Sequence, residues 1–186
     1  FQGLRAAVDP DTEPLVLPLI DYNHLGRPDR FGGQTILDVN FLAITRQEGT
    51  DTRRLSIRPG WQLPFVDSLG GVYKFSAGLN VDLYQVDHLA QSGKDTYSGL
   101  SGRVVPQVVL DWRMPFVKNT GNVSQVIEPI AVAIYSPYGG NSTKIPNEDS
   151  SELEFDDTNL LSANRFTGLD RVEGGPRFAY GLKWGS

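Results

Sequence analysis

The sequence predicts an all-β fold, an antiparallel up-and-down meander of about seven long strands. Glycine (20 residues) and proline (12 residues) are abundant, which disfavours helices and favours turns. Apolar and polar residues alternate with a period of two over long stretches, as in strands whose two faces meet different surroundings. The segments between these stretches are rich in the residue types of tight turns, which predicts that consecutive strands are joined as hairpins.

Seven segments are predicted as strands, at residues 14–22, 35–45, 53–66, 72–86, 103–118, 123–137 and 176–185. The alternation is strict in the third, fourth, fifth and seventh segments, where aliphatic and aromatic residues occupy one face and mainly polar residues the other. It is less regular in the first two. In the sixth segment both faces carry apolar residues around Glu128.

The connections differ in length. Residues 47–51, 67–71 and 119–122 are short and contain Gly, Asn, Asp or Ser, which predicts tight hairpins. Residues 88–102 and 139–174 are predicted as long loops. Because these two are the fourth and sixth connections of a meander, we expect both loops on the same side of the sheet.

Strand length separates a membrane barrel from a soluble sandwich, since both have one apolar face. The predicted strands contain roughly 10–16 residues, whereas soluble strands peak near 5–6 and a tilted membrane-spanning strand needs about 9–11. Aromatic residues such as Trp61, Phe65 and Trp112 lie toward the ends of the apolar rows, as in the aromatic girdles of membrane barrels. We therefore predict a sector of a transmembrane β-barrel. The alternatives are a porin-like outer-membrane pore and a soluble β-sandwich or lipid-binding module.

Composition excludes several classes of function. The chain carries 17 Lys and Arg against 22 Asp and Glu, with no basic block, so no nucleic-acid partner is expected. It has no cysteine, which removes thiol catalysis and Cys-ligated zinc, and only two histidines. No Gly-x-Ser-x-Gly motif occurs, and we expect neither an enzyme nor a bound cofactor. The absence of an apolar run of 18 residues argues against a transmembrane helix.

The first three residues, Phe1-Gln2-Gly3, are typical of what a tag protease leaves behind. We therefore expect residues 4–186 to form the natural domain, and this domain to be part of a longer protein.

An ordered series of motifs carries a resemblance to a known family. The series comprises Glu13-Pro14, Arg103-Val104-Val105-Pro106-Gln107, Val126-Ile127-Glu128-Pro129, Tyr135-Ser136-Pro137-Tyr138, Ile145-Pro146-Asn147, Asp156-Asp157 with Asn159-Leu160, and Asn164-Arg165-Phe166-Thr167-Gly168-Leu169-Asp170-Arg171. In this order and spacing, nearly the whole chain resembles a middle portion of the C-terminal outer-membrane β-barrel of the LptD family, also called OstA or Imp.

The resemblance implies a very large barrel of about 26 strands in the bacterial outer membrane, which assembles lipopolysaccharide into the outer leaflet. It implies three partners: lipopolysaccharide, an LptE-type plug lipoprotein in the lumen, and a periplasmic Lpt bridge reached through domains absent here. Seven strands cannot close that barrel. The lateral gate and the periplasmic domain are expected outside this sequence.

The polar face of the strands is expected to line the barrel lumen. Its candidate residues are Arg54, Arg58, Gln62, Lys74, Asn80, Asp82, Arg103, Gln107, Asp111, Arg113 and Glu128. They would form a hydrated path for sugar and phosphate groups, or would contact the plug lipoprotein, since mixed charge in a wide barrel stays solvated. The alternative is general lumen polarity without a specific ligand.

Two features of the long loop at 139–174 are candidates for a role. Arg165, Asp170 and Arg171 are expected to pair with each other or with lumen charges and to fold the loop inward, with Phe166 and Gly168 in a packed turn. The acidic run at 147–157 includes Asp156 and Asp157, a weak candidate site for a divalent cation. This run does not match an EF-hand, and a solvated surface loop is the favoured interpretation.

Overall fold

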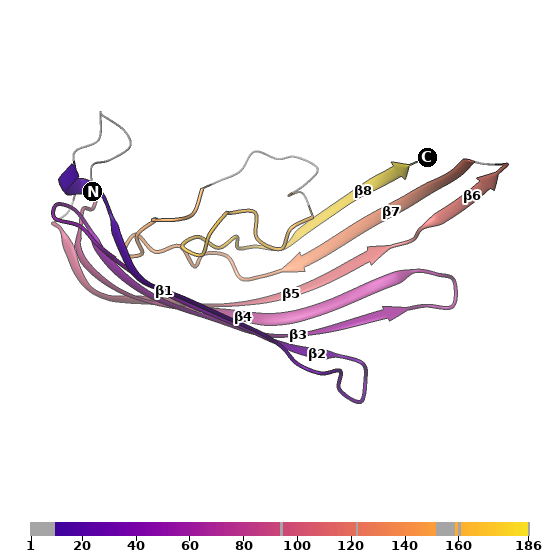
Figure 1. The fold of residues 1–186 in the computed structure, drawn as a ribbon, viewed down its shortest axis with the longest axis horizontal. Coiled ribbons are helices and arrows are strands. Elements are labelled where there is room, and N and C mark those ends of the chain that lie inside the picture. Colours follow the sequence, from indigo (N-terminus) through magenta and orange to yellow (C-terminus); the bar gives the residue numbers. More distant parts are fainter. Residues whose placement is uncertain (1–9, 94, 122, 152–158, 160, 186) are drawn as a thin grey trace.

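A computed structural model describes residues 10–93, 95–121, 123–151, 159 and 161–185. In this part the chain forms one curved antiparallel sheet of eight strands (Figure 1). The strands are β1 (Leu15–Leu25), β2 (Gln34–Thr45), β3 (Asp51–Val66), β4 (Val72–Leu89), β5 (Tyr97–Arg113), β6 (Phe116–Thr120), β7 (Val123–Tyr135) and β8 (Arg177–Gly185), preceded by a short 3₁₀ turn, η1 (Pro10–Thr12). No described helix is long and apolar enough to cross a membrane. The predicted tag remnant, residues 1–3, and the candidate cation ligands Asp156 and Asp157 lie outside the described residues.

The topology is the predicted meander. Strands β1 to β5 each pair with the next strand in sequence, and β7 pairs with β5, β6 and β8. The central strands are long, with 16 residues in β3, 18 in β4 and 17 in β5. Within the described residues β1 pairs only with β2, and β8 only with β7, so the sheet is open at both sides and does not close into a barrel by itself.

The strand predicted at 103–118 is interrupted. Pro115 has no N–H to donate to the ladder, and β5 ends at Arg113 while β6 begins at Phe116. The register continues across the break, because Arg113 pairs with Ile130 and Phe116 with Ile127. The N–H of Met114 donates to the carbonyl of Pro129 at 3.1 Å. Strands β5 and β6 therefore follow one line, and this break turns the predicted seven strands into eight.

The prediction of a long loop at 88–102 is wrong. Strand β4 runs to Leu89 and β5 begins at Tyr97, so only residues 90–96 connect them. Small polar residues and glycines between Tyr97 and Gly102 give little hydropathy contrast and hide the alternation of this strand. A register shift between Val86 and Leu89, where His88 has a φ of 60°, further disguises the end of β4.

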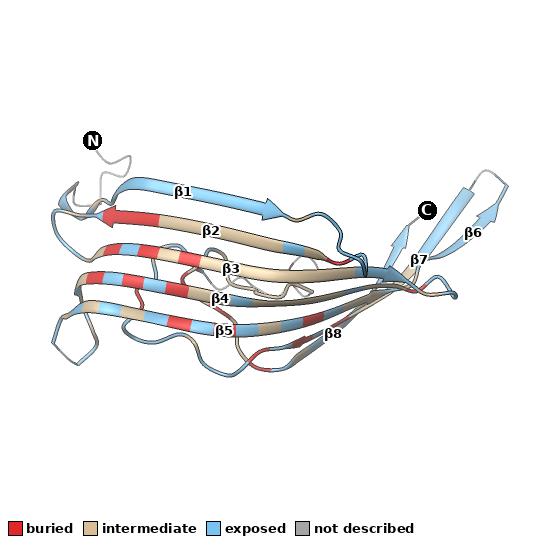
Figure 2. Cartoon of the chain, turned by 90° about the horizontal axis from the view of Figure 1, so that it is seen from below, coloured by how far each residue is buried: buried red, intermediate tan, exposed pale blue. Residues whose placement is uncertain are grey.

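Burial of the two faces of the sheet is inverted relative to a water-soluble protein. On the apolar face, Leu79 is 41% exposed and Val104 is 64% exposed, whereas on the polar face Arg54 and Asp82 are each only 2% exposed. Buried residues alternate along β3, β4 and β5 toward one end of the sheet (Figure 2). Between β7 and β8, the described residues 136–151, 159 and 161–176 cover the polar side at this end (Figure 1). The chain's own loop therefore shields the charged face, and the apolar face stays uncovered within the described residues.

Two small apolar clusters hold the loop on the sheet. Ile145 packs with Tyr84 and Val86 of β4, and all three are fully buried or nearly so. Farther along, Leu161 and Ala163 pack against buried residues of β5 and β7, namely Val109, Val132 and Ile134. The core of this chain thus lies between its loop and the inner face of its sheet.

Candidate functional site

The strand register places the central charges of the site side by side. Ser56 of β3 pairs with Asp82 of β4, and Asp82 pairs with Arg103 of β5. Arg54 lies two residues from Ser56 on the same face and pairs with Tyr84. Because side chains alternate between the faces of a strand, these residues all project from the polar face. We call Arg54, Asp82, Tyr84, Arg103 and Asp170 the loop anchor, since Asp170 of the loop joins them.

Asp170 is at the centre of the loop anchor and is 1% exposed. Its carboxylate accepts hydrogen bonds from Nη1 of Arg54 at 2.6 Å and from the Tyr84 hydroxyl at 3.1 Å. The backbone N–H groups of Glu148 and Asp149 donate to its other oxygen at 2.7 and 3.2 Å. These donors compensate for the burial of a charge that would otherwise be strongly unfavourable.

Arg103 connects two parts of the loop to the wall. Its Nε donates to Asp82 at 2.6 Å, and its Nη1 donates to the Asp170 carbonyl at 2.8 Å and to the Asn141 amide oxygen at 3.0 Å. Its Nη2 donates to the Leu169 carbonyl. The planar fork of arginine suits this arrangement, because it directs several donors at fixed angles from one side chain. Arg103 therefore ties residues 141 and 169–170 to β4 and β5.

Asp149 provides a second carboxylate to Arg54, at 2.6 Å from Nη1, and accepts the N–H groups of Leu169 and Asp170. The contact of the Asp149 carboxylate with the backbone of residues 169 and 170 requires glycine at position 168. Gly168 has a φ of +68°, and a Cβ there would lie 2.4 Å from Oδ1 of Asp149. The predicted packed turn around Gly168 therefore closes on the Asp149 side chain.

The two loop carboxylates differ in acidity although they share Arg54. Burial raises the pKa of the Asp170 carboxyl above its ordinary value, with the Arg54 charge opposing the shift. Burial acts in the same direction on Asp149, but its hydrogen bond to Arg54 and the charge of Arg54 outweigh it and hold the pKa below the ordinary value. On acidification Asp170 is therefore expected to take up a proton before Asp149.

The other predicted loop residues pair differently from Asp170. Arg165 forms an ion pair with Glu173, which also binds Arg177. Arg171 donates to the backbone carbonyls of Ile145 and Pro146 at 3.3 and 3.2 Å. Phe166 is half-buried. The sequence left the pairing of these residues open. In the structure Asp170 forms an ion pair with Arg54 of β3, while Arg165 pairs with Glu173 of the loop.

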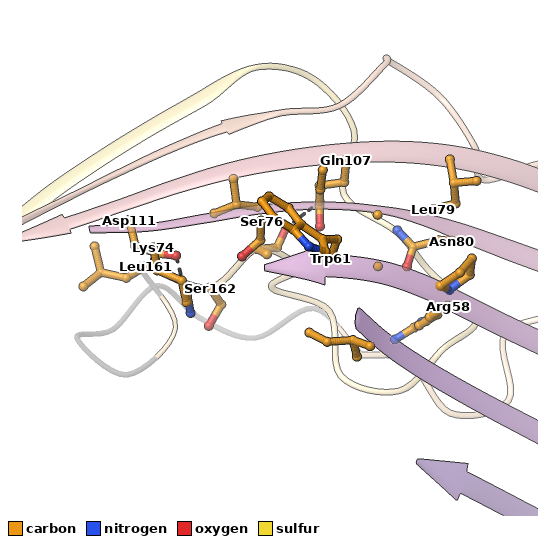
Figure 3. Close-up of a pocket in the computed structure, with 17 residues that line it drawn as sticks. Arg58, Trp61, Lys74, Ser76, Leu79, Asn80, Gln107, Asp111, Leu161 and Ser162 are labelled. Atoms are coloured by element: carbon orange, nitrogen blue, oxygen red, sulfur yellow. Dashed lines mark hydrogen bonds and ion pairs between the residues drawn. The ribbon is translucent and has the colours of Figure 1, made fainter. Parts of the chain in front are cut away.

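The remaining polar residues of the inner face lie toward the other end of the strands. Lys74 and Asp111 form an ion pair at 3.4 Å, and Arg113 and Glu128 approach to 3.8 Å. Arg58, Lys74, Asn80, Gln107 and Asp111 border a cavity beneath the loop (Figure 3). Gln62 is half-buried and close to Gln34. Of the predicted polar residues, Arg54, Asp82 and Arg103 belong to the loop anchor and five border this cavity, whereas Gln62, Arg113 and Glu128 belong to neither group.

Sequence reasoning missed several residues that hold the loop. They are Tyr84, Asn141, Glu148, Asp149 and Ser150. Glu148 binds Arg46 in an ion pair at 2.6 Å and accepts a hydrogen bond from Thr52 at 3.2 Å. The acidic sequence around these residues favours a solvated loop, yet Asp149 binds Arg54 of β3 and Glu148 binds Arg46 in the connection between β2 and β3.

Substituting Arg103 with lysine tests the importance of the guanidinium fork. Lysine keeps a positive charge for Asp82 but cannot reach Asn141, Leu169 and Asp170 together. We expect cleavage of the loop by an added protease to rise about tenfold, corresponding to a loss of roughly 1.4 kcal/mol in loop stability. Arg53→Lys is the matched control, since Arg53 is an exposed arginine of β3. Equal protease resistance of both variants would contradict the role given to the fork.

The fold and the site together define a class of protein. A single-layer antiparallel sheet with long strands, an apolar outer row and a charged inner row covered by its own loop is a sector of a β-barrel wall. Residues 1–185 match the family model of LptD, described as LPS transport system D. The chain belongs to the LptD family.

Similar proteins agree with this assignment. The chain is 32% identical to the LPS-assembly protein LptD of Pseudomonas putida, over 79% of this chain and 17% of that protein. It is 36% identical to LptD of Neisseria gonorrhoeae, over 73% of the chain and 17% of that protein, and 31% identical to LptD of Escherichia coli, over 77% and 18%. The chain therefore spans less than one fifth of the length of these relatives.

Proposed function

We propose that this chain forms a sector of the wall, together with an inward-folded loop, of an outer-membrane barrel that assembles lipopolysaccharide into the outer leaflet. The observation that carries the proposal is the inverted burial of the sheet. An uncovered apolar face suits contact with lipid, and a charged face suits a water-filled lumen. The names of the similar proteins supply the substrate, because they are LPS-assembly proteins.

The connections support an orientation of the sector in the membrane. Strand β7 ends and β8 begins at the end of the sheet where β2 is joined to β3 and β4 to β5, whereas the connections β1–β2 and β3–β4 lie at the opposite end (Figure 1). Outer-membrane barrels have longer loops outside the cell and shorter turns in the periplasm. We infer that the loop anchor lies in the extracellular half of the lumen.

The partners of the proposed translocon follow from the same assignment. A plug lipoprotein of the LptE type would contact the inner face or the covering loop, and the periplasmic bridge would act through domains outside this chain. The charges of the loop anchor are occupied by hydrogen bonds and ion pairs within the chain. We therefore assign this sector a binding and guiding role without covalent catalysis.

A porin-like pore and a soluble β-sandwich are less well supported. In an open pore the polar face would be solvated, but Ile145, Leu161 and Ala163 of the long connection pack on it. A sandwich needs a second sheet against the apolar row, and the described residues form a single sheet.

Depletion of the full-length protein in its own host tests the proposal. We expect newly made lipopolysaccharide at the cell surface to fall several-fold, and a plasmid copy of the full-length protein to restore it. The measurement is pulse-labelling of lipopolysaccharide followed by surface detection with an antibody. Unchanged surface lipopolysaccharide, accompanied by loss of small-solute uptake, would instead identify a general pore.

A further inference from the structure

A hollow in the inner wall lies beneath the loop, separate from the loop anchor. Gly60 of β3 pairs directly with Gly78 of β4, so two adjacent positions on the polar face have no side chain. Here the sheet and residues 161–163 of the loop line an open cavity of about 400 Å³ (Figure 3). This volume is within the range of small-ligand sites.

Backbone packing keeps the hollow open. A Cβ at position 78 would lie 3.0 Å from the Pro59 carbonyl oxygen and 3.4 Å from the Gly60 Cα, which is tighter than most side chains tolerate. At position 60 the nearest atom, the Ala77 carbonyl oxygen, is 3.4 Å away, so a side chain there is possible. Position 78 thus favours glycine for steric reasons, whereas glycine at position 60 leaves space that a larger residue would fill.

The charge around the hollow suits an anion. Nε and Nη2 of Arg58 are buried and donate to no described residue, and Arg58 forms no ion pair with one. Lys74, whose side chain is 50% exposed, is held only by a 3.4 Å contact with Asp111. Buried guanidinium nitrogens without a hydrogen-bond acceptor are unfavourable, and a bound anion would relieve this cost.

The remaining polar groups around the hollow suit a sugar. Ser76 contributes a hydroxyl, and Asn80 and Gln107 contribute amides that both donate and accept hydrogen bonds. Gln107 also donates to the Ala163 carbonyl at 3.1 Å, and this hydrogen bond fixes the Gln107 side chain on the loop side of the hollow. Hydroxyl and amide groups beside Arg58 and the Lys74–Asp111 ion pair match a saccharide that carries a negative substituent.

We propose that this hollow is a subsite for an anionic group on a sugar, either a phosphoryl group or a carboxylate, of the lipopolysaccharide handled by the barrel. The proposal rests on the function proposed above, which supplies the glycolipid. Arg58 binds the anion, Lys74 adds positive charge, and Ser76, Asn80 and Gln107 bind sugar hydroxyls. The Gly60–Gly78 pair provides the room.

Photo-crosslinking in cells tests the subsite in the full-length protein. The crosslinking residue replaces Gln62, which is next to the hollow on the inner face, or Leu63, which faces outward as a control. We expect a lipopolysaccharide adduct at position 62 that falls at least fivefold when Arg58→Gln is added. Arg53→Gln, a change of an exposed arginine in the same strand, should leave the adduct unchanged. Heat-modifiable migration in gels verifies that each variant is folded.

A second variant keeps the test decisive if Arg58→Gln does not fold. Gly60→Val fills the hollow without removing a charge, and it should lower the adduct to a similar extent, whereas Gly181→Val in β8, with nothing within 4 Å of its added Cβ, should not. In hosts whose lipopolysaccharide lacks core phosphoryl groups, loss of the adduct would identify the phosphoryl group as the ligand, and its retention the carboxylate.

Two outcomes overturn the subsite. One is an adduct at position 62 with the plug lipoprotein in place of lipopolysaccharide, which would assign the hollow to a protein side chain. The other is a lipopolysaccharide adduct unaffected by both Arg58→Gln and Gly60→Val. If depletion still lowers surface lipopolysaccharide in these cases, only the subsite fails. If depletion has no effect on surface lipopolysaccharide, the proposed function fails with it.

Discussion

Replacing Asp170 with alanine is expected to release the loop from the barrel wall. The change removes a buried carboxylate, leaves Tyr84 and two backbone N–H groups without their acceptor, and takes away one of the two carboxylates that bind Arg54. Breaking a buried ion pair from one side costs about 3–5 kcal/mol, and the lower value applies here because Asp149 still binds Arg54. We expect loop cleavage by added protease to rise on the order of a hundredfold in cells that express the full-length variant.

Ser142→Ala in the same loop is the control for Asp170→Ala. The Ser142 hydroxyl accepts only the exposed N–H of Lys144, at 3.2 Å, among the hydrogen bonds of the described residues. The second readout is co-purification of the plug lipoprotein, which should fall for Asp170→Ala and not for Ser142→Ala. If Asp170→Ala equals the wild type in both assays, residues 164–171 are a passive surface turn and the loop anchor has no role in assembly.

A charge on the apolar face should be far more harmful than the same charge on the polar face. Leu79 and Asn80 are neighbours in β4 at nearly the same depth, and Leu79 is 41% exposed on the apolar side. In the full barrel, Leu79→Arg should lose about 2–4 kcal/mol of folding free energy, because arginine would face hydrocarbon. Asn80→Arg should be nearly neutral for folding, since it faces the lumen.

The measurement for this pair is the free energy of unfolding of the full-length protein in lipid vesicles, from urea titration followed by heat-modifiable migration. Similar losses for both variants would show that the two faces of β4 do not meet different solvents. A larger loss for Asn80→Arg would reverse the facing assignment of the whole sheet, because the register links β4 to its neighbours on both sides.

The path of the sheet could be predicted from the sequence because alternation is a local signal. Along β3, the row that contains Leu55, Ile57 and Leu63 is apolar at every second position, and the structure keeps this phase. The signal fails where residues have little hydropathy contrast, as in the Ser- and Gly-rich start of β5 between Tyr97 and Gly102. It also does not reveal that Pro115 divides one predicted strand into two.

The candidate site could be predicted only in part. Arg54, Asp82 and Arg103 could be predicted as inner-face residues, because the period-two alternation places each of them on the polar face of its strand. The partner of Asp170 could not be chosen, since the Arg54–Asp170 contact joins residues 116 positions apart and depends on the path of the loop. No pattern in the sequence distinguishes Asp149 from the acidic residues around it, although Asp149 binds Arg54 from the loop.

The central claim is that the sheet has one lipid-facing row and one lumen-facing row, and that the loop covers the extracellular part of the lumen-facing row. Spin labels attached at single cysteines from position 74 to position 84 of the full-length protein in lipid bilayers test it most directly. We predict high accessibility to oxygen at odd positions and to a water-soluble relaxation agent at 74 and 76, with low accessibility to both at 82 and 84 beneath the loop; Gly78, where a Cβ would crowd the Pro59 carbonyl oxygen, is left unlabelled. Water-soluble access at the odd positions, or a profile without a period of two, would contradict the account.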